Sequence, residues 1–287
     1  MKIIPVENDT KHRKMPRGNT RKNSLEQYYT QDYVAEMCVD FLLEHVSASH
    51  WIEPSAGAGM FKHVMEDFGE SVDAYDIEPT SHDIKKADWL TVKIDNPETV
   101  VFGNPPFGRA CSMAVKHFNH AAKQQNCKAI AFIIPPSFKK ISIEDKLHLN
   151  FWRTQTLTLP RDAFEKPDGT PYEEGIMQCE FQIWERKEKQ REKRQKYRSS
   201  LFSFVTQDKD HDVVIRTHGS KAGTLLEPTG DWNFRTCAFI KIHDDKALKT
   251  LKALEKNGYD YYKYSTAYIP CIAPAEIAVC VDEYLLK

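Results

Sequence analysis

The sequence lacks a long apolar run, which is the mark of a membrane-spanning helix. No stretch approaches the roughly eighteen consecutive apolar residues that such a helix needs. Residues 1–23 are polar and basic, and they contain no apolar core of the kind found in signal peptides. We therefore expect a soluble, intracellular (cytoplasmic) protein with no membrane partner.

Cysteine pairs at metal-binding spacing are also missing. The 7 Cys are odd in number and scattered, and none forms a Cys-x-x-Cys pair. The 11 His include no pair at ligand spacing. These absences argue against a disulfide framework and against a structural zinc site. We expect buried thiols and no metal.

A strong net charge is absent, but basic residues gather in two segments. The formal net charge is -1, from 40 Lys and Arg against 41 Asp and Glu. Residues 1–23 nevertheless carry seven Lys or Arg against two acids, and residues 186–198 carry eight against two. Such segments suit contacts with phosphates. They suit a solvated helix or linker equally well, and charge alone leaves both readings open.

The remaining composition, 41% hydrophobic and 28% charged, is that of a folded globular protein. Its 287 residues exceed one average domain of roughly 100–200 residues. The changes in composition and periodicity divide the chain into a basic flexible arm at residues 1–27, a catalytic domain at 28–185, a basic linker helix at 186–200 and a small C-terminal α+β region at 201–287.

Short apolar strands alternate with amphipathic helices in the expected catalytic domain. The strands are expected at residues 50–53, 72–76, 87–90, 99–103, 129–134, 154–159 and 178–184, the last two as an antiparallel pair. The alternation predicts a Rossmann-like α/β fold, with a mostly parallel sheet and helices on both faces. In the C-terminal region we expect strands at 213–215, 224–227 and 237–242 and a helix at 245–255.

A glycine-rich turn follows the first expected strand. Gly57-Ala58-Gly59 would let the backbone pass close to a ligand at the carboxyl edge of the sheet, where helix N–H groups converge. Alone it could be a tight turn without a ligand. Asp76 supports the ligand reading, because an acid at the end of the next strand can accept both ribose hydroxyls of an adenosine cofactor.

Asn104-Pro105-Pro106-Phe107 directly follows a buried strand and therefore shares the sheet edge with the glycine turn. An aromatic amine is a poor nucleophile, and two acceptors fixed on its N–H bonds would help it attack a methyl group. The Asn104 side-chain oxygen and the Pro105 carbonyl can be those acceptors, Pro106 stiffens the loop, and Phe107 offers a face on which a base can stack.

These motifs resemble, in order and spacing, those of class I S-adenosylmethionine-dependent methyltransferases that methylate amino groups. The matching segments are Glu53 to Gly59, Asp76-Ile77, Asp88-Trp89 and Asn104 to Phe107. Tyr28-Tyr29-Thr30 is similar to the Tyr-Thr motif of adenine-N6 DNA methyltransferases whose target-recognition region lies at the C-terminus. The resemblance covers residues 28–185.

The resemblance implies S-adenosylmethionine as the cofactor, a seven-stranded sheet, and a role for each matching residue. The implied cofactor-binding residues are Tyr29 and Thr30 near the methionine moiety, Glu53, Pro54, Ser55, Ala56, Gly57 and Gly59 in the cofactor loop, Asp76 on the ribose, Ile77 on the adenine, and Asp88 on the adenine amino group, with Trp89 beside it. The implied catalytic residues are Asn104, Pro105, Pro106 and Phe107.

The resemblance implies methylation of adenine N6 in DNA, by base flipping and direct in-line transfer. Residues 201–287 would then recognise the substrate, and the tyrosines of residues 258–268, with Arg216, His218 and Lys221, would either grip a polynucleotide or pack in a core. The open alternatives are adenine-N6 or guanine-N2 methylation of RNA, methylation of cytosine or of a protein glutamine, and a catalytically silent nucleic-acid-binding module.

Overall fold

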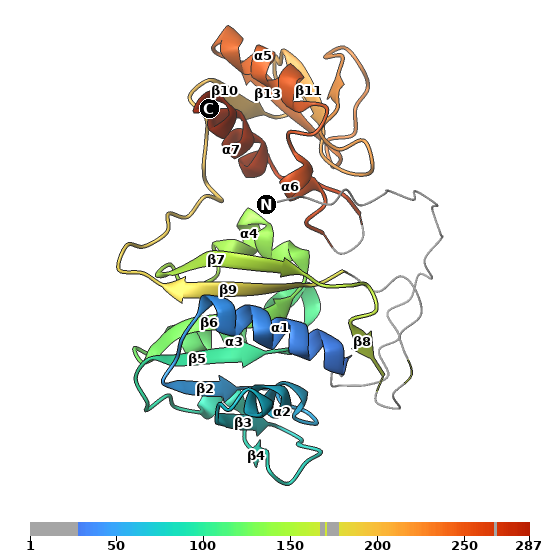
Figure 1. The fold of residues 1–287 in the computed structure, drawn as a ribbon. Helices are drawn as coiled ribbons and strands as arrows, with labels where there is room; N and C mark the ends of the chain where they lie inside the picture. Colours follow the sequence, from blue (N-terminus) through green and yellow to red (C-terminus); the bar gives the residue numbers. More distant parts are fainter. Residues whose placement is uncertain (1–27, 167–169, 171–177, 267–268) are drawn as a thin grey trace.

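The computed structural model describes residues 28–166, 170, 178–266 and 269–287. The expected arm at 1–27, most of the loop that follows Lys166, and Tyr268 lie outside the described residues. Figure 1 shows two units joined by an extended segment. The larger unit contains a seven-stranded sheet, and the smaller unit is C-terminal.

Among the described residues, seven strands form the larger sheet, in the order β4-β3-β2-β5-β6-β9-β7. They are β2 (His50–Glu53), β3 (Val72–Asp76), β4 (Lys85–Lys86), β5 (Thr99–Gly103), β6 (Cys127–Ile134), β7 (Phe151–Thr158) and β9 (Glu180–Arg186). From β4 to β6 each neighbouring pair is parallel, and β9 is antiparallel to both β6 and β7. The predicted Rossmann-like, mostly parallel sheet is confirmed, and so is its antiparallel pair.

Helices cover both faces of this sheet (Figure 1). On one face α1 (Asp32–His45) and α2 (Met60–Asp67) share a buried apolar cluster with Phe102 of β5. On the other face α3 (Ser112–Ala122) shares a second cluster with Val101, the preceding residue of the same strand. Successive strand residues point to opposite faces, so a strand that is buried on both faces has a continuous apolar sequence.

One expected strand, at residues 87–90, is wrong. The structure has the two-residue β4 just before it, followed by a 3-10 turn at Trp89–Thr91. Asp88 causes this turn, because its Oδ1 accepts from the Leu90 N–H at 2.9 Å and its carbonyl accepts from the Thr91 N–H at 2.9 Å. A short polar side chain that bonds its own backbone competes with a strand ladder.

The expected linker helix at residues 186–200 is also wrong, because no residue of this fully described segment is helical. The Arg191 N–H donates to the Leu149 carbonyl at 2.8 Å, and its buried guanidinium donates to the Phe151 carbonyl at 2.6 Å and to the Glu144 carboxylate. Backbone donors satisfied by a neighbouring segment do not need helical partners. Residues 187–200 therefore form a non-helical segment that packs against the catalytic unit through Arg191.

The C-terminal unit is an antiparallel sheet with helices on one side, and its described strands follow the order β10-β13-β11-β12. Its elements are β10 (Phe202–Val205), β11 (Val213–Arg216), β12 (Leu225–Leu226), β13 (Cys237–Ile242), α5 (Asp245–Leu254), α6 (Asp260–Lys263) and α7 (Pro274–Leu285). The expected β11, β12, β13 and α5 are confirmed. The sequence did not indicate α7, because Ala275–Val281 is buried on every side and has no amphipathic period.

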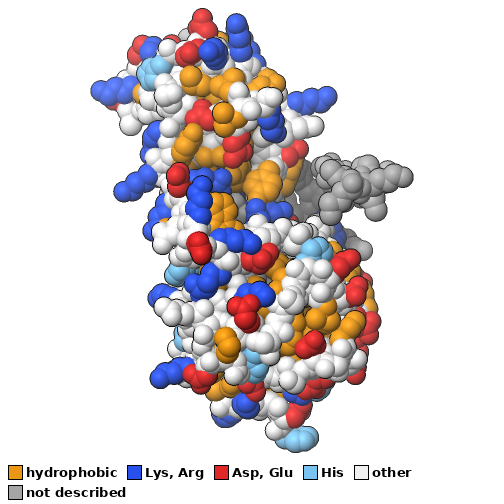
Figure 2. Space-filling model, turned by 60° about the vertical axis from the view of Figure 1, so that its left-hand side comes forward, with side chains coloured by type: hydrophobic (Ala, Val, Ile, Leu, Met, Phe, Trp, Pro, Cys, Tyr) orange, Lys and Arg blue, Asp and Glu red, His pale blue; other side chains and the backbone are white. Residues whose placement is uncertain are grey.

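A buried ion pair joins the two units. Lys140, at the start of α4 (Ile141–Glu144), pairs with the fully buried Glu276 of α7 and donates to the Cys271 carbonyl at 2.9 Å. On the face shown in Figure 2, Lys and Arg side chains gather along the band between the units, mixed with acidic ones. In the part of the chain that the structure describes, no helix has the length and apolarity needed to cross a bilayer.

Candidate functional site

A cavity of about 550 Å³ lies at the carboxyl edge of the seven-stranded sheet. It is lined by the residues that follow β2, β3 and β5, together with β1 (Tyr29–Thr30) and one side of α3. The carboxyl ends of parallel strands meet at one edge, which is where ligands bind in open α/β sheets. The volume falls within the range of roughly 300–1,000 Å³ that is usual for ligand sites.

Most of the residues predicted from the sequence meet in this cavity. Those that line it are Tyr29, Thr30, Glu53, Pro54, Ser55, Ala56, Gly57, Asp76, Ile77, Asp88, Trp89, Asn104 and Pro106. Three predicted residues are not part of the lining. Gly59 is the N-cap of α2, Pro105 is buried beneath the loop, and Phe107 stacks on Tyr28 with ring centroids 6.3 Å apart.

The segment before α1 reaches the cavity through a long-range strand pair. Tyr29 and Thr30 pair antiparallel with β8 (Phe164–Glu165), and the Gln31 N–H extends the ladder by donating to the Ala163 carbonyl at 3.1 Å. This pairing holds residues 28–30 across the end of the seven-stranded sheet. It brings Tyr28 and Thr30 within hydrogen-bond distance of the Asn104 side chain.

Asn104 is held in one orientation. Its Nδ2 donates to the Tyr28 carbonyl at 3.0 Å and to the Thr30 Oγ1 at 3.2 Å. A carbonyl can only accept, so the network itself determines which end of the amide is nitrogen. Both N–H groups of the amide are used. Oδ1 therefore remains as an acceptor on a side chain that lines the cavity, with no hydrogen-bond partner among the described residues.

Asp76 fastens the glycine turn to the end of β3. Its Oδ2 accepts from the Gly57 N–H and its Oδ1 from the Glu78 N–H, both at 2.8 Å. Gly57 has φ of 55°, which an L side chain rarely adopts. Each carboxylate oxygen has a further lone pair, so Asp76 can shape the turn and still accept from a ligand's hydroxyl groups.

Glu53 lies beneath the cavity, where it links the ends of β2 and β5. Its Oε2 accepts from the Lys62 N–H at 2.9 Å, in the first turn of α2. A Cβ at Gly103 would come within 3.2 Å of the Glu53 Cγ, so the two strand ends fit closely. Burial raises the pKa of Glu53, and the hydrogen bond from Lys62 opposes that rise.

Asp88 and Trp89 form the opposite side of the cavity. Asp88 uses Oδ1 to cap the 3-10 turn, so its other oxygen can accept from a ligand. Trp89 is 2% exposed, and its Nε1 donates to the His117 carbonyl at 3.2 Å. Ile77, in contrast, is 53% exposed at the mouth, where its side chain can cover the flat face of a ring.

His117 also lines this side, and the sequence analysis did not single it out. Its Nδ1 lies 3.0 Å from the Met113 carbonyl. Nδ1 must therefore carry the hydrogen, and in the neutral ring Nε2 is an acceptor. Burial lowers the pKa of His117 and favours that neutral form. Its helical spacing from Ala114 and Ala121, on the buried face of α3, is the signal that could have revealed it.

The loop after Pro106 has an unusual backbone. Gly108 has φ of 69°, and a Cβ there would lie 2.9 Å from the Met113 backbone nitrogen, so only glycine fits. Ala110 and Cys111 have φ of 51° and 62°, conformations that cost about 1–3 kcal/mol each and cluster at functional sites. The Met113 and Ala114 N–H groups both donate to the Phe107 carbonyl, which ties the loop to α3.

Comparison with known proteins gives only distant structural similarities. No protein-family model matches the sequence, and no curated protein matches it. A protein of Listeria monocytogenes, provisionally named a class I S-adenosylmethionine-dependent methyltransferase, has a TM-score of 0.42 and 12% identity over 58% of this chain and 64% of its own.

Two further solved structures show similarity of the same order. One, provisionally named an RNA methyltransferase of Pyrococcus horikoshii, has a TM-score of 0.41 and 15% identity over 57% of this chain and 90% of its own. An S-adenosylmethionine-dependent O-methyltransferase of Thermotoga maritima has a TM-score of 0.34 and 12% identity over 60% and 70%. Similarity this distant defines no activity for this chain. The fold rests on its own strand order.

Proposed function

We propose that this protein is an S-adenosylmethionine-dependent methyltransferase that methylates the exocyclic N6 amine of adenine in DNA. The observation that carries the proposal is the fixed Asn104 amide. Its Nδ2 is held by Tyr28 and Thr30, and its Oδ1 is left as an acceptor in a cavity whose other polar groups suit an adenosine-containing cofactor.

The residues of the cavity fit that cofactor. Asp76 has lone pairs for ribose hydroxyls, and Asp88 has an oxygen available for an adenine amino group. Ile77 and Trp89 provide apolar surface for the adenine ring, and Tyr29, next to Gly57, bounds the methionine end. Glu53 adds a carboxyl group near that end, whereas the Thr30 hydroxyl accepts from Asn104. When bound, the cofactor supplies an electrophilic methyl group on a sulfonium ion.

In this proposal Asn104 makes the target amine nucleophilic. Its Oδ1 accepts one N–H of the amine, and this bond favours a lone pair directed at the methyl group. The Pro105 carbonyl, the second acceptor that the resemblance implies, belongs to a residue outside the cavity lining. Held in this way, the amine nitrogen would accept the methyl group that the bound cofactor supplies, and its extra proton would pass to water. A flipped base has to enter the cavity for this geometry. The Tyr28–Phe107 stack borders its path.

Asn104→Ala tests the mechanism. We expect turnover to fall roughly 10²- to 10³-fold, the usual effect of removing one preorganised transition-state partner. Cofactor affinity by calorimetry should stay within about threefold, because the glycine turn and both acidic residues are unchanged. Asn96→Ala, on an exposed loop, is the matched control. Normal turnover in Asn104→Ala would contradict the mechanism.

The acceptor is identified by methyl transfer from tritiated S-adenosylmethionine to unmethylated DNA and to RNA in parallel. The labelled nucleosides are then identified by mass spectrometry. We expect N6-methyladenine in DNA. If only RNA were labelled, the proposed methylation of an amine would stand, and the substrate would be RNA instead of DNA. If neither polymer were labelled, a nucleic-acid substrate would be refuted.

A further inference from the structure

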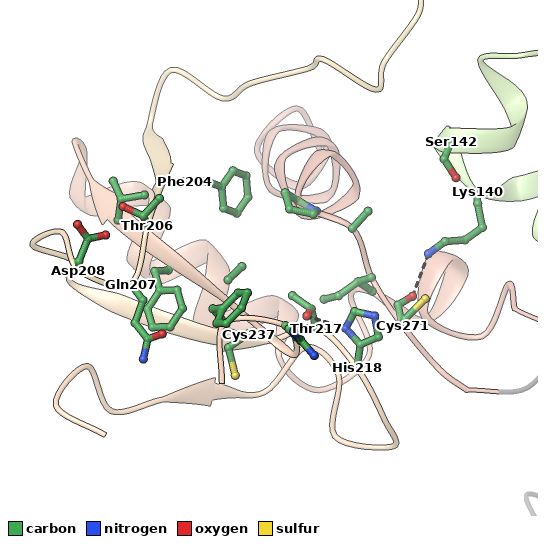
Figure 3. A pocket seen from close by; sticks show the side chains of 18 residues that line it. Lys140, Ser142, Phe204, Thr206, Gln207, Asp208, Thr217, His218, Cys237 and Cys271 are labelled. Atoms are coloured by element: carbon green, nitrogen blue, oxygen red, sulfur yellow. Dashed lines mark hydrogen bonds between the residues drawn. The ribbon is translucent and has the colours of Figure 1, made fainter. Parts of the chain in front are cut away.

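A second, larger cavity of about 920 Å³ opens where the C-terminal unit meets the catalytic unit. Figure 3 shows Lys140 and Ser142 of the catalytic unit at one end and Thr206, Gln207 and Asp208 at the other. The cavity lies where β10 leaves the sheet, since the pairing of β10 with β13 stops at Val205. The methyl-transfer chemistry proposed above uses none of its lining residues.

Three aromatic rings belong to the apolar part of this cavity's lining. Phe204, Phe234 and Phe239 all contribute to the lining. Phe234 is 64% exposed, whereas Phe239 is 4% exposed and closes the inner side. A single exposed apolar residue is common on protein surfaces. Here the exposed ring stands at the mouth of a nucleotide-sized cavity, and an accessible ring face is what an unstacked base binds.

Two arginines near the rings have no carboxylate partner among the described residues. Arg235 lines the cavity, whereas Arg216 lies outside its lining. The Arg235 guanidinium lies 5.7 Å from the Phe234 ring centroid. Arg216 pairs in register with Cys237, so it lies on the same sheet face as Cys237 and Phe239. Its buried Nε lacks a hydrogen-bond partner within the described ranges. Unpaired guanidinium groups beside an aromatic surface favour an anionic, aromatic ligand.

The other polar groups of the lining fit the edge of a base rather than a second anion. Lys140 is already occupied by Glu276 and by the Cys271 carbonyl. Gln207 donates to the Trp232 carbonyl at 2.9 Å, which leaves its oxygen as an acceptor. Asp208 stands at the same rim, and its carboxylate can accept from an exocyclic amine. Its negative charge would oppose a phosphate placed directly against it.

We propose that this cavity binds an unstacked nucleotide of the substrate strand, at a site separate from the cavity that would hold the target base. The base stacks on Phe234, and the adjoining phosphate faces Arg235. The inference rests on the proposed function only in requiring a nucleic-acid substrate. It gives the C-terminal unit a contact with the polynucleotide through this cavity. The tyrosines of residues 258–268 are a less suitable contact, because Tyr259 and Tyr262 are buried.

The test is binding of a short, labelled single-stranded DNA by fluorescence anisotropy in the full-length protein. Phe234→Ala should weaken binding roughly 5- to 100-fold, the effect of losing one base–aromatic stack, and Phe234→Trp should restore it. Arg235→Ala should lower the slope of log affinity against log salt by about 0.7, the value for one phosphate contact with a single strand. Phe68→Ala and Lys252→Ala, both exposed and on other faces, are the controls.

A second measurement locates the contact directly. DNA carrying 5-iodouracil is photocrosslinked to the protein, and the labelled peptide is identified by mass spectrometry. We expect the peptide that contains Phe234. Crosslinks confined to the catalytic unit, or unchanged affinity in Phe234→Ala, would overturn the inference.

The outcomes separate this inference from the proposed function. If the wild-type protein bound DNA through Phe234 but transferred no methyl group, the proposed methyltransferase activity would be refuted and the nucleotide-binding site would stand. If Phe234→Ala transferred methyl groups with an unchanged KM for DNA, the nucleotide-binding site would be refuted and the proposed methyltransferase activity would stand. The binding assay also distinguishes Asn104→Ala, which should retain DNA affinity while losing turnover.

Discussion

Thr30→Val tests whether the orientation of the Asn104 amide contributes to turnover, because it keeps Asn104 and removes one of its two hydrogen-bond partners. The substitution removes the Oγ1 that accepts from Asn104 Nδ2 at 3.2 Å, while the Tyr28 carbonyl at 3.0 Å is unaffected. Thr30 is 5% exposed and both residues are β-branched, so the short strand should be retained. The amide keeps one of its two anchors, and we expect a partial effect, smaller than that of Asn104→Ala.

The size of that effect follows from the lost bond. A neutral hydrogen bond contributes about 0.5–1.5 kcal/mol net, which corresponds to a roughly 2- to 12-fold lower turnover number. Thr30→Ser retains the hydroxyl and should recover most of the rate. Thr158→Val, at the exposed end of β7, is the matched control. The assay compares the turnover number with cofactor affinity. If Thr30→Val weakened cofactor affinity as much as it lowered turnover, the positioning role would be refuted.

Three further predictions test the cavity and the junction. Asp76→Ala removes the acceptor of the Gly57 N–H, so cofactor affinity by calorimetry should fall roughly 10- to 100-fold; unchanged affinity would remove its ligand role. Glu276→Gln leaves the buried Lys140 charge uncompensated and should cost about 3–5 kcal/mol in urea unfolding; a loss below about 1 kcal/mol would contradict a tight junction. Because burial lowers the pKa of His117 from 6.5, its stabilisation is complete above pH 6.5 and is lost as the pH falls through the folded-state pKa. Unfolding measured between about pH 7.5 and about pH 5 should therefore depend less on pH in His117→Gln; equal dependence would contradict a neutral buried ring.

Several features of the fold were predictable because they depend on residues close in the sequence. The apolar strand at residues 99–103, the turn residues of Asn104-Pro105-Pro106 and the helical spacing in α3 are local signals, and each predicted the observed element. The glycine turn and Asp76 were placed at one sheet edge because parallel strands share their carboxyl ends. These rules were enough to gather most of the cavity's lining.

The wrong linker helix and the missed α7 both reflect contacts between distant segments. The basic run at residues 186–200 has the composition of a solvated helix, but Arg191 is buried against Glu144 and Phe151. Sequence spacing carries no information about a partner forty residues away. Likewise, Ala275–Val281 of α7 gave no amphipathic signal, because this part of the helix is buried on every side.

The sequence by itself determined that Asn104, the glycine turn and Asp76 share one sheet edge, since each lies at or shortly after the end of a local strand. Only the tertiary structure decided how Asn104 points. Its orientation depends on Tyr28 and Thr30, which are held in place by β8 across more than a hundred residues of chain. Such a contact closes a long loop, and the entropy that this costs must be offset by the surrounding packing.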